Sequence, residues 1–138
     1  MEPFRYHVFV CTQQKPEGTP CCSAGGSAKL LEVLQSELQK QGLFNHVQVT
    51  SCGCLGLCDN GPDMITYPDG IWYSNLKPEN IVEIVRSHFV EGRPVTRLQR
   101  RDLATMKSEI LDHRDRYLAS LKAKNWLELR VRQLLVGQ

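Results

Sequence analysis

The chain has 138 residues, a net charge of +2 and a hydrophobic fraction of 41%, which suits one domain with its own core. No apolar run approaches the roughly 20 residues of a membrane span, and no secretory signal precedes the first predicted strand. We therefore expect a cytoplasmic protein with no membrane partner. All six cysteines lie in the first 58 residues. In a reducing compartment such thiols are more often metal ligands or redox groups than structural disulfides.

A short strand and a cysteine-containing loop come first in the chain. Residues Tyr6–Val10 are mostly β-branched or aromatic and predict a buried strand, which Cys11 follows directly. The next segment, Thr12–Gly26, is rich in proline and glycine and carries Cys21 and Cys22 near its end. Ligands of open α/β sheets bind at the carboxyl ends of strands. Cys11 therefore lies where a ligand is expected.

A helix and a second strand then complete a βαβ unit. Ser27 is a candidate N-cap and Gly42 a candidate helix end. Between them, leucines repeat at helical spacing, at Leu30, Leu31, Leu34 and Leu38. The alternating segment His46–Thr50 predicts the second strand, and the cysteine-rich segment Ser51–Pro62 follows it. Because parallel neighbouring strands end at the same edge of a sheet, we expect the two cysteine groups to meet there.

The next 30 residues predict a hairpin and a helix. Two short apolar runs, Met64–Tyr67 and Ile71–Tyr73, flank the turn residues Pro68-Asp69-Gly70. A helix is expected from about Pro78, and its apolar stripe is Ile81, Ile84, Val85 and Phe89. The order βαββα predicts an α/β (α+β) fold with a small mixed sheet.

The last 42 residues differ from the rest in charge. Residues 97–138 carry ten Lys and Arg against five Asp and Glu, whereas residues 1–96 carry seven against ten. An apolar stripe predicts a helix from about Leu98, with a break near Asn125 and a second short helix after it. The stripe consists of Leu103, Met106, Ile110, Tyr117 and Leu121. We expect two units, a domain over 1–96 and a helical extension over 97–138.

The spacing of the cysteines excludes several familiar sites. Cys54 and Cys58 could form a zinc knuckle, but Cys11 and Cys22 are too far apart for one. The C-x2-C-x2-C run of bacterial ferredoxins and the C-x-x-C of thioredoxin-like redox sites are both absent. The four histidines all stand at least four residues from a cysteine, so we expect core or surface roles for them. These residues are His7, His46, His88 and His113.

Four segments together resemble the thioredoxin-like [2Fe-2S] ferredoxins. They are His7–Cys11, Cys22–Ser27, Gly53–Pro62 and Tyr67–Tyr73. The resemblance implies a thioredoxin-like fold, one [2Fe-2S] cluster, one-electron transfer and a homodimer. It places the cluster ligands at Cys11, Cys22, Cys54 and Cys58. Cys21 competes with Cys22 and Cys52 with Cys54, and motif register favours the second residue of each pair.

The leading hypothesis is a low-potential electron carrier that exchanges single electrons with redox partner proteins and is not an enzyme. No constellation of general base and nucleophile is present, so we expect no catalytic residues. The alternative is an Fe-S or zinc regulatory module that acts through the basic C-terminal helices. A thiol oxidoreductase on the same fold is a third hypothesis. We expect no nucleic-acid partner, because the tail has no helix-turn-helix signal or basic patch with interleaved aromatics.

Overall fold

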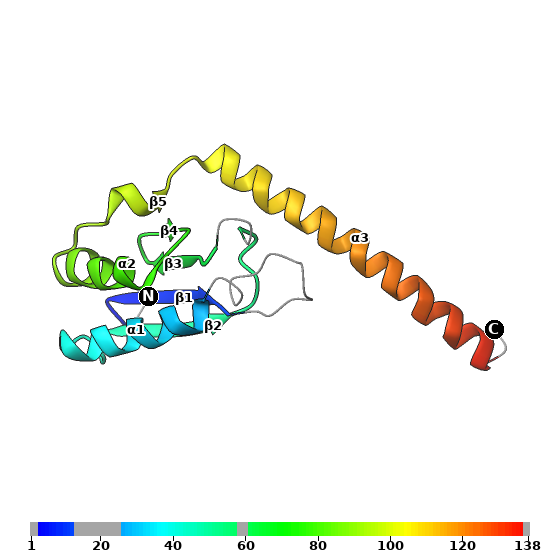
Figure 1. The fold of residues 1–138 in the computed structure, drawn as a ribbon, viewed down its shortest axis with the longest axis horizontal. Helices are drawn as coiled ribbons and strands as arrows, with labels where there is room; N and C mark the ends of the chain where they lie inside the picture. Colours follow the sequence, from blue (N-terminus) through cyan, green and yellow to red (C-terminus); the bar gives the residue numbers. More distant parts are fainter. Residues whose placement is uncertain (1–2, 13–25, 58–60, 137–138) are drawn as a thin grey trace.

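The structure is a computed structural model that describes residues 3–12, 26–57 and 61–136. In these ranges a mixed sheet has the strand order β2-β1-β3-β4-β5. Its strands are β1 (Tyr6–Cys11), β2 (Val47–Cys52), β3 (Met64–Tyr67), β4 (Ile71–Tyr73) and β5 (Gln99–Arg100). β1 and β2 are parallel, and the other neighbours are antiparallel. The predicted mixed sheet is confirmed (Figure 1).

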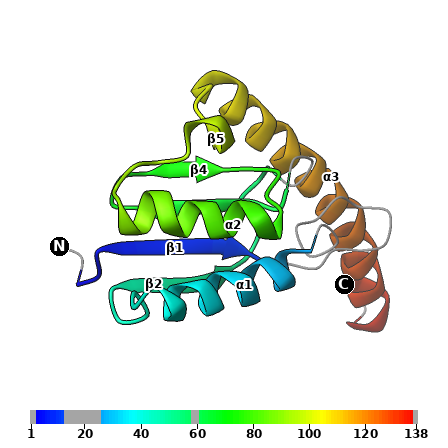
Figure 2. The same cartoon turned by 60° about the vertical axis from the view of Figure 1, so that its left-hand side comes forward.

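Two helices lie side by side on one face of the sheet (Figure 2). They are α1 (Ser27–Lys40) and α2 (Pro78–Ile84), which continues as a π-helical segment, Val85–Val90. The predicted leucine stripe of α1 is buried, at Leu30, Leu34 and Leu38. Because side chains alternate along a strand, Val8 and Val10 of β1 join this core while His7 and Phe9 stay half-buried. The core therefore lies between the sheet and these helices.

The hairpin between β3 and β4 turns where the sequence predicts it. Gly70 has a φ of +69°, a value that glycine adopts without steric cost. Thr66 Oγ1 donates to Asp69 Oδ1 at 2.9 Å, and His88 Nε2 lies 2.5 Å from Asp69 Oδ2. The other ring nitrogen of His88, Nδ1, lies 2.8 Å from Tyr73 Oη. His88 thus links the hairpin to the helical layer, which agrees with the core role expected for it.

A fifth strand, which the sequence did not predict, follows the helical layer. β5 has only two residues and pairs antiparallel with β4, Gln99 opposite Tyr73 and Arg100 opposite Trp72. Two residues are too few to show a period-2 pattern, so no sequence signal marks them. The sheet therefore extends past residue 96.

The C-terminal segment is one helix, α3 (Leu103–Val136), and not the two helices expected. Asp102 begins it as a cap, because its Oδ1 accepts from the backbone N–H of Thr105 at 3.2 Å. The prediction of a break at Asn125 was wrong. Asparagine in a helix interior costs well under about 1 kcal/mol, too little to end a helix flanked by strong helix formers. None of the helices in the described ranges is long and apolar enough to cross a membrane.

Candidate metal centre

The cysteines of the described ranges converge at the carboxyl ends of β1 and β2. Cys11 is the last residue of β1 and stands opposite Cys52, the last residue of β2. The backbone N–H of Thr12 donates to the Cys52 carbonyl at 3.1 Å, which holds the two strand ends together. Burial raises the pKa of the Cys52 thiol, and the nearby Cys11 and Cys54 thiols raise it further. The predicted meeting of the two cysteine groups is confirmed for these three residues.

The remaining predicted positions fall outside the described residues. These are Cys22 and Cys58, proposed as ligands, and Cys21, proposed as a competitor. Within 3–12, 26–57 and 61–136 no three His, Cys, Asp or Glu side chains form a metal-binding group. Two of the four expected ligands, Cys11 and Cys54, are therefore placed by the structure at one edge of the sheet.

In the loop after β2, a backbone N–H points at the sulfur of a cysteine in the same loop. Gly56 has a φ of +95°, which suits glycine, and its N–H donates to Cys54 Sγ at 3.3 Å. Leu57, the next residue, is 1% exposed. A backbone N–H directed at sulfur stabilises a thiolate over a thiol, because the hydrogen bond strengthens with the charge of its acceptor.

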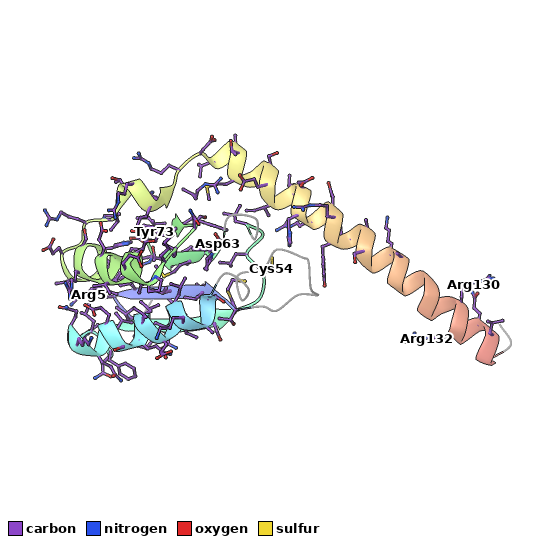
Figure 3. The ribbon with its side chains drawn as sticks, in the orientation of Figure 1. Arg5, Cys54, Asp63, Tyr73, Arg130 and Arg132 are labelled. Carbon is purple, nitrogen blue, oxygen red and sulfur yellow. The ribbon has the colours of Figure 1, made fainter. Side chains whose placement is uncertain are left out.

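Helix α3 passes directly over this loop, with Cys54 beneath it in the view of Figure 3. His113 Nε2 lies 3.1 Å from Cys54 Sγ. Ile110 packs on Gly56, where an added Cβ would stand 2.9 Å from Ile110 Cγ2. A cavity of about 260 Å³ lies between the two segments, lined by the loop residues Cys54 and Gly56 and by Ile110, His113 and Tyr117 of α3.

His113 is the residue at this site that the sequence analysis missed, since it expected a core or surface role there. The signal available was its place in the apolar stripe of the tail. Met106, Ile110, His113 and Tyr117 follow one another at spacings of four, three and four residues, so His113 shares the face that the stripe buries. The stripe is only partly covered, because Met106 is 4% exposed and Tyr117 51%.

The donor set suits iron bound to sulfur. Thiolates are the soft ligands that Fe–S clusters use, and the structure places the buried Cys11 and the half-buried Cys54 near the same end of the sheet. The Gly56 N–H adds a donor to one of these sulfurs. A group that binds through thiolate sulfur and carries negative charge therefore fits the residues present.

Comparisons with known proteins agree with this chemistry. The family model described as thioredoxin-like [2Fe-2S] ferredoxin matches residues 2–88. A 2Fe-2S ferredoxin of Aquifex aeolicus is 41% identical over 95 residues, which are 67% of this chain and 86% of the relative. A 2Fe-2S ferredoxin of Clostridium pasteurianum is 37% identical over 97 residues, or 69% of this chain and 95% of the relative.

A solved structure shows the same fold. The wild-type thioredoxin-like [2Fe-2S] ferredoxin from Aquifex aeolicus superposes with a TM-score of 0.68 at 38% sequence identity, over 72% of this chain and 99% of that one. The thioredoxin-like fold that the sequence resemblance implied is thereby confirmed.

Proposed function

Because the chain belongs to the thioredoxin-like [2Fe-2S] ferredoxin family, and so carries electrons on a [2Fe-2S] cluster rather than acting as an enzyme, we propose which residues hold that cluster. The ligands are Cys11, Cys22, Cys54 and Cys58. The observation that carries this proposal is the convergence of Cys11 and the Cys54 loop where the parallel strands β1 and β2 end. Cys22 and Cys58 are carried over from the family motif.

Local contacts favour Cys54 over Cys52 as the ligand of the second loop. Cys54 Sγ accepts the Gly56 N–H and lies within hydrogen-bonding distance of His113. Donors of this kind orient ligand sulfurs and tune the group they bind. Cys52 is the last residue of β2, whereas Cys54 lies in the loop that follows the strand.

The bound cluster supplies one-electron chemistry. The protein holds the thiolates at one end of the sheet, where helix α3 covers the Cys54 loop through Ile110 and His113. Four thiolates concentrate negative charge there, so the addition of an electron is costly. We propose a low reduction potential, near the value of about −400 mV found for plant-type clusters. Such a carrier passes single electrons between redox partner proteins.

Single Cys→Ala variants at all six cysteines test the ligand set. Each protein is purified anaerobically, and iron, sulfide and visible absorbance are measured. Loss of the cluster is expected for the four proposed ligands, while Cys21→Ala and Cys52→Ala, the matched controls, should keep it. A cluster that survives Cys22→Ala but not Cys21→Ala, or Cys54→Ala but not Cys52→Ala, contradicts the assignment.

Three further predictions accompany this proposal. We propose a homodimer, which light scattering of the full chain in solution tests. A cytoplasmic location stays a prediction.

The division into a cluster-binding domain over 1–96 and an extension over 97–138 also stays a proposal. β5 lies wholly beyond this boundary and still joins the sheet, so limited proteolysis is expected to cut after Arg100 and not before Gln99.

A further inference from the structure

Helix α3 lies outside the part of the chain that resembles the relatives. The family match ends at residue 88, whereas α3 begins at Leu103. The Aquifex aeolicus structure is covered over 99% of its length by only 72% of this chain. The helix is therefore an addition to the family fold, and its first half returns to the proposed ligand loop (Figures 1 and 3).

Several contacts hold the start of α3 in this position. Arg100 of β5 donates to Glu109 at 3.1 Å, which ties the helix to the edge of the sheet. Met106 is buried, and one turn further on Ile110 lies against Gly56 with no room for a Cβ between them. His113 comes next on the same face. Its position over Cys54 is thus set by the ion pair of α3 with β5 and by the packing of Ile110 on Gly56.

We propose that His113 is a positioning residue that donates its Nε2–H to the Cys54 thiolate and raises the reduction potential of the bound cluster. The inference rests on the proposed role of Cys54 as a ligand. A thiolate bound to metal has no proton and can only accept, so the ring nitrogen 3.1 Å away must be the donor. The donor stabilises the ligand sulfur more when the site carries an extra electron, because the acceptor is then more negative.

Through this contact, α3 adjusts the reduction potential of the cluster bound by the same chain. The part of the chain that the family model matches already supplies a backbone donor to the same sulfur, the Gly56 N–H at 3.3 Å. His113 adds a side-chain donor from a segment that the matched part of the family does not contain. Two donors on one sulfur shift the potential further than one, which distinguishes this chain from relatives that end before α3.

Reduction potentials of two variants and a control test the proposal. His113→Leu removes the donor, whereas His113→Gln keeps an amide N–H at a similar reach. His46→Leu makes the same change at an exposed histidine that precedes β2, at the opposite end of the strand from the cysteines. Each full-length, cluster-loaded protein is titrated and followed by visible absorbance and EPR.

His113→Leu is expected to lower the reduction potential of the cluster. At a fixed potential, His113→Leu should lower the ratio of reduced to oxidised protein about tenfold, which corresponds to about 59 mV for one electron. His113→Gln should recover most of this shift, and His46→Leu should show none. An unchanged or raised potential in His113→Leu, or equal shifts in the leucine and glutamine variants, overturns the proposal.

A measurement on the unsubstituted protein covers the case in which a variant loses its cluster. Protein labelled with ¹⁵N-histidine should show a weakly coupled ¹⁵N nucleus in pulsed EPR of the reduced state. Absence of that coupling overturns the role of His113 and leaves the ligand set untouched. Retention of the cluster in Cys54→Ala, in contrast, refutes the ligand assignment itself.

Discussion

Replacing Gly56 by alanine perturbs the contact between the cysteine loop and α3 in two ways. The φ of +95° is rarely adopted by residues with a Cβ, and left-handed backbone costs about 1–2 kcal/mol for such residues. The new Cβ would also stand 2.9 Å from Cγ2 and 3.0 Å from Cγ1 of Ile110. Overpacking of this kind costs about 1–3 kcal/mol, here at the low end because the new Cβ meets a single side chain. The expected loss is about 2–4 kcal/mol.

Two comparisons separate the steric cost from the backbone cost. Gly42 has a φ of +71°, and a Cβ there would meet nothing within 4 Å, so Gly42→Ala reports backbone strain alone. The change Ile110→Ala removes the two closest atoms. In that background the cost of Gly56→Ala should fall close to that of Gly42→Ala, because only the Cβ of residue 110, at 3.3 Å, remains near the new methyl group.

Urea unfolding of the cluster-loaded protein, followed by far-UV circular dichroism, gives the free energies. Amide hydrogen exchange of residues 106–117 then shows whether α3 has lifted from the loop. If Gly56→Ala costs the same as Gly42→Ala, or the same with and without the Ile110 side chain, α3 does not rest on the loop as described. His113 would then not be held over Cys54 by the packing of Ile110 on Gly56.

The remaining predictions concern buried polar groups. Tyr73→Phe deprives the Val95 N–H of its acceptor at 3.1 Å and His88 Nδ1 of its partner, so a loss of about 1–3 kcal/mol in urea unfolding is expected; a loss below about 0.5 kcal/mol would contradict it. Burial raises the pKa of Tyr73 to about 12, above its unfolded value, so this residue's stabilisation is complete below about pH 10 and lost as pH rises toward 12. The stability of Tyr73→Phe should therefore decline less between those pH values than that of the unsubstituted protein, and a parallel decline of the two would refute this prediction. Burial works to raise the pKa of Glu37, but hydrogen bonds from Gln41 and Arg86 outweigh it and hold this pKa below its usual value. The stabilisation that Glu37 gives the fold is thus present above its unfolded pKa and lost as pH falls through its folded pKa. Glu37→Gln should therefore lose less stability at acid pH than the unsubstituted protein. A urea midpoint that falls equally steeply with acid pH in both proteins would contradict this prediction.

The sequence predicts those parts of the fold that a regular pattern encodes. The leucine stripe of α1 and the strand predicted over Tyr6–Val10 appear in the structure as the two sides of one core. The turn at Asp69 was predictable because its residue types demand a turn. The meeting of Cys11 with the second cysteine loop followed from strand direction alone, since a parallel pair shares its carboxyl edge.

Features that depend on tertiary contacts were not predictable in the same way. β5 forms because Gln99 and Arg100 pair with the edge of β4. The types of two residues alone do not predict such a pairing. The contact of His113 with Cys54 joins residues 59 positions apart in the chain. The continuity of α3 through Asn125 reflects the small penalty of one asparagine against the cooperativity of a long helix.

A potentiometric titration of the anaerobically purified, full-length protein tests the central claim most directly, with iron and sulfide quantified in the same sample. We predict about two iron and two sulfide ions per chain and one reversible one-electron transition at low potential, near about −400 mV. A chain that binds metal but takes up no electron reversibly, or a transition near or above 0 mV, would contradict a low-potential carrier held by four thiolates.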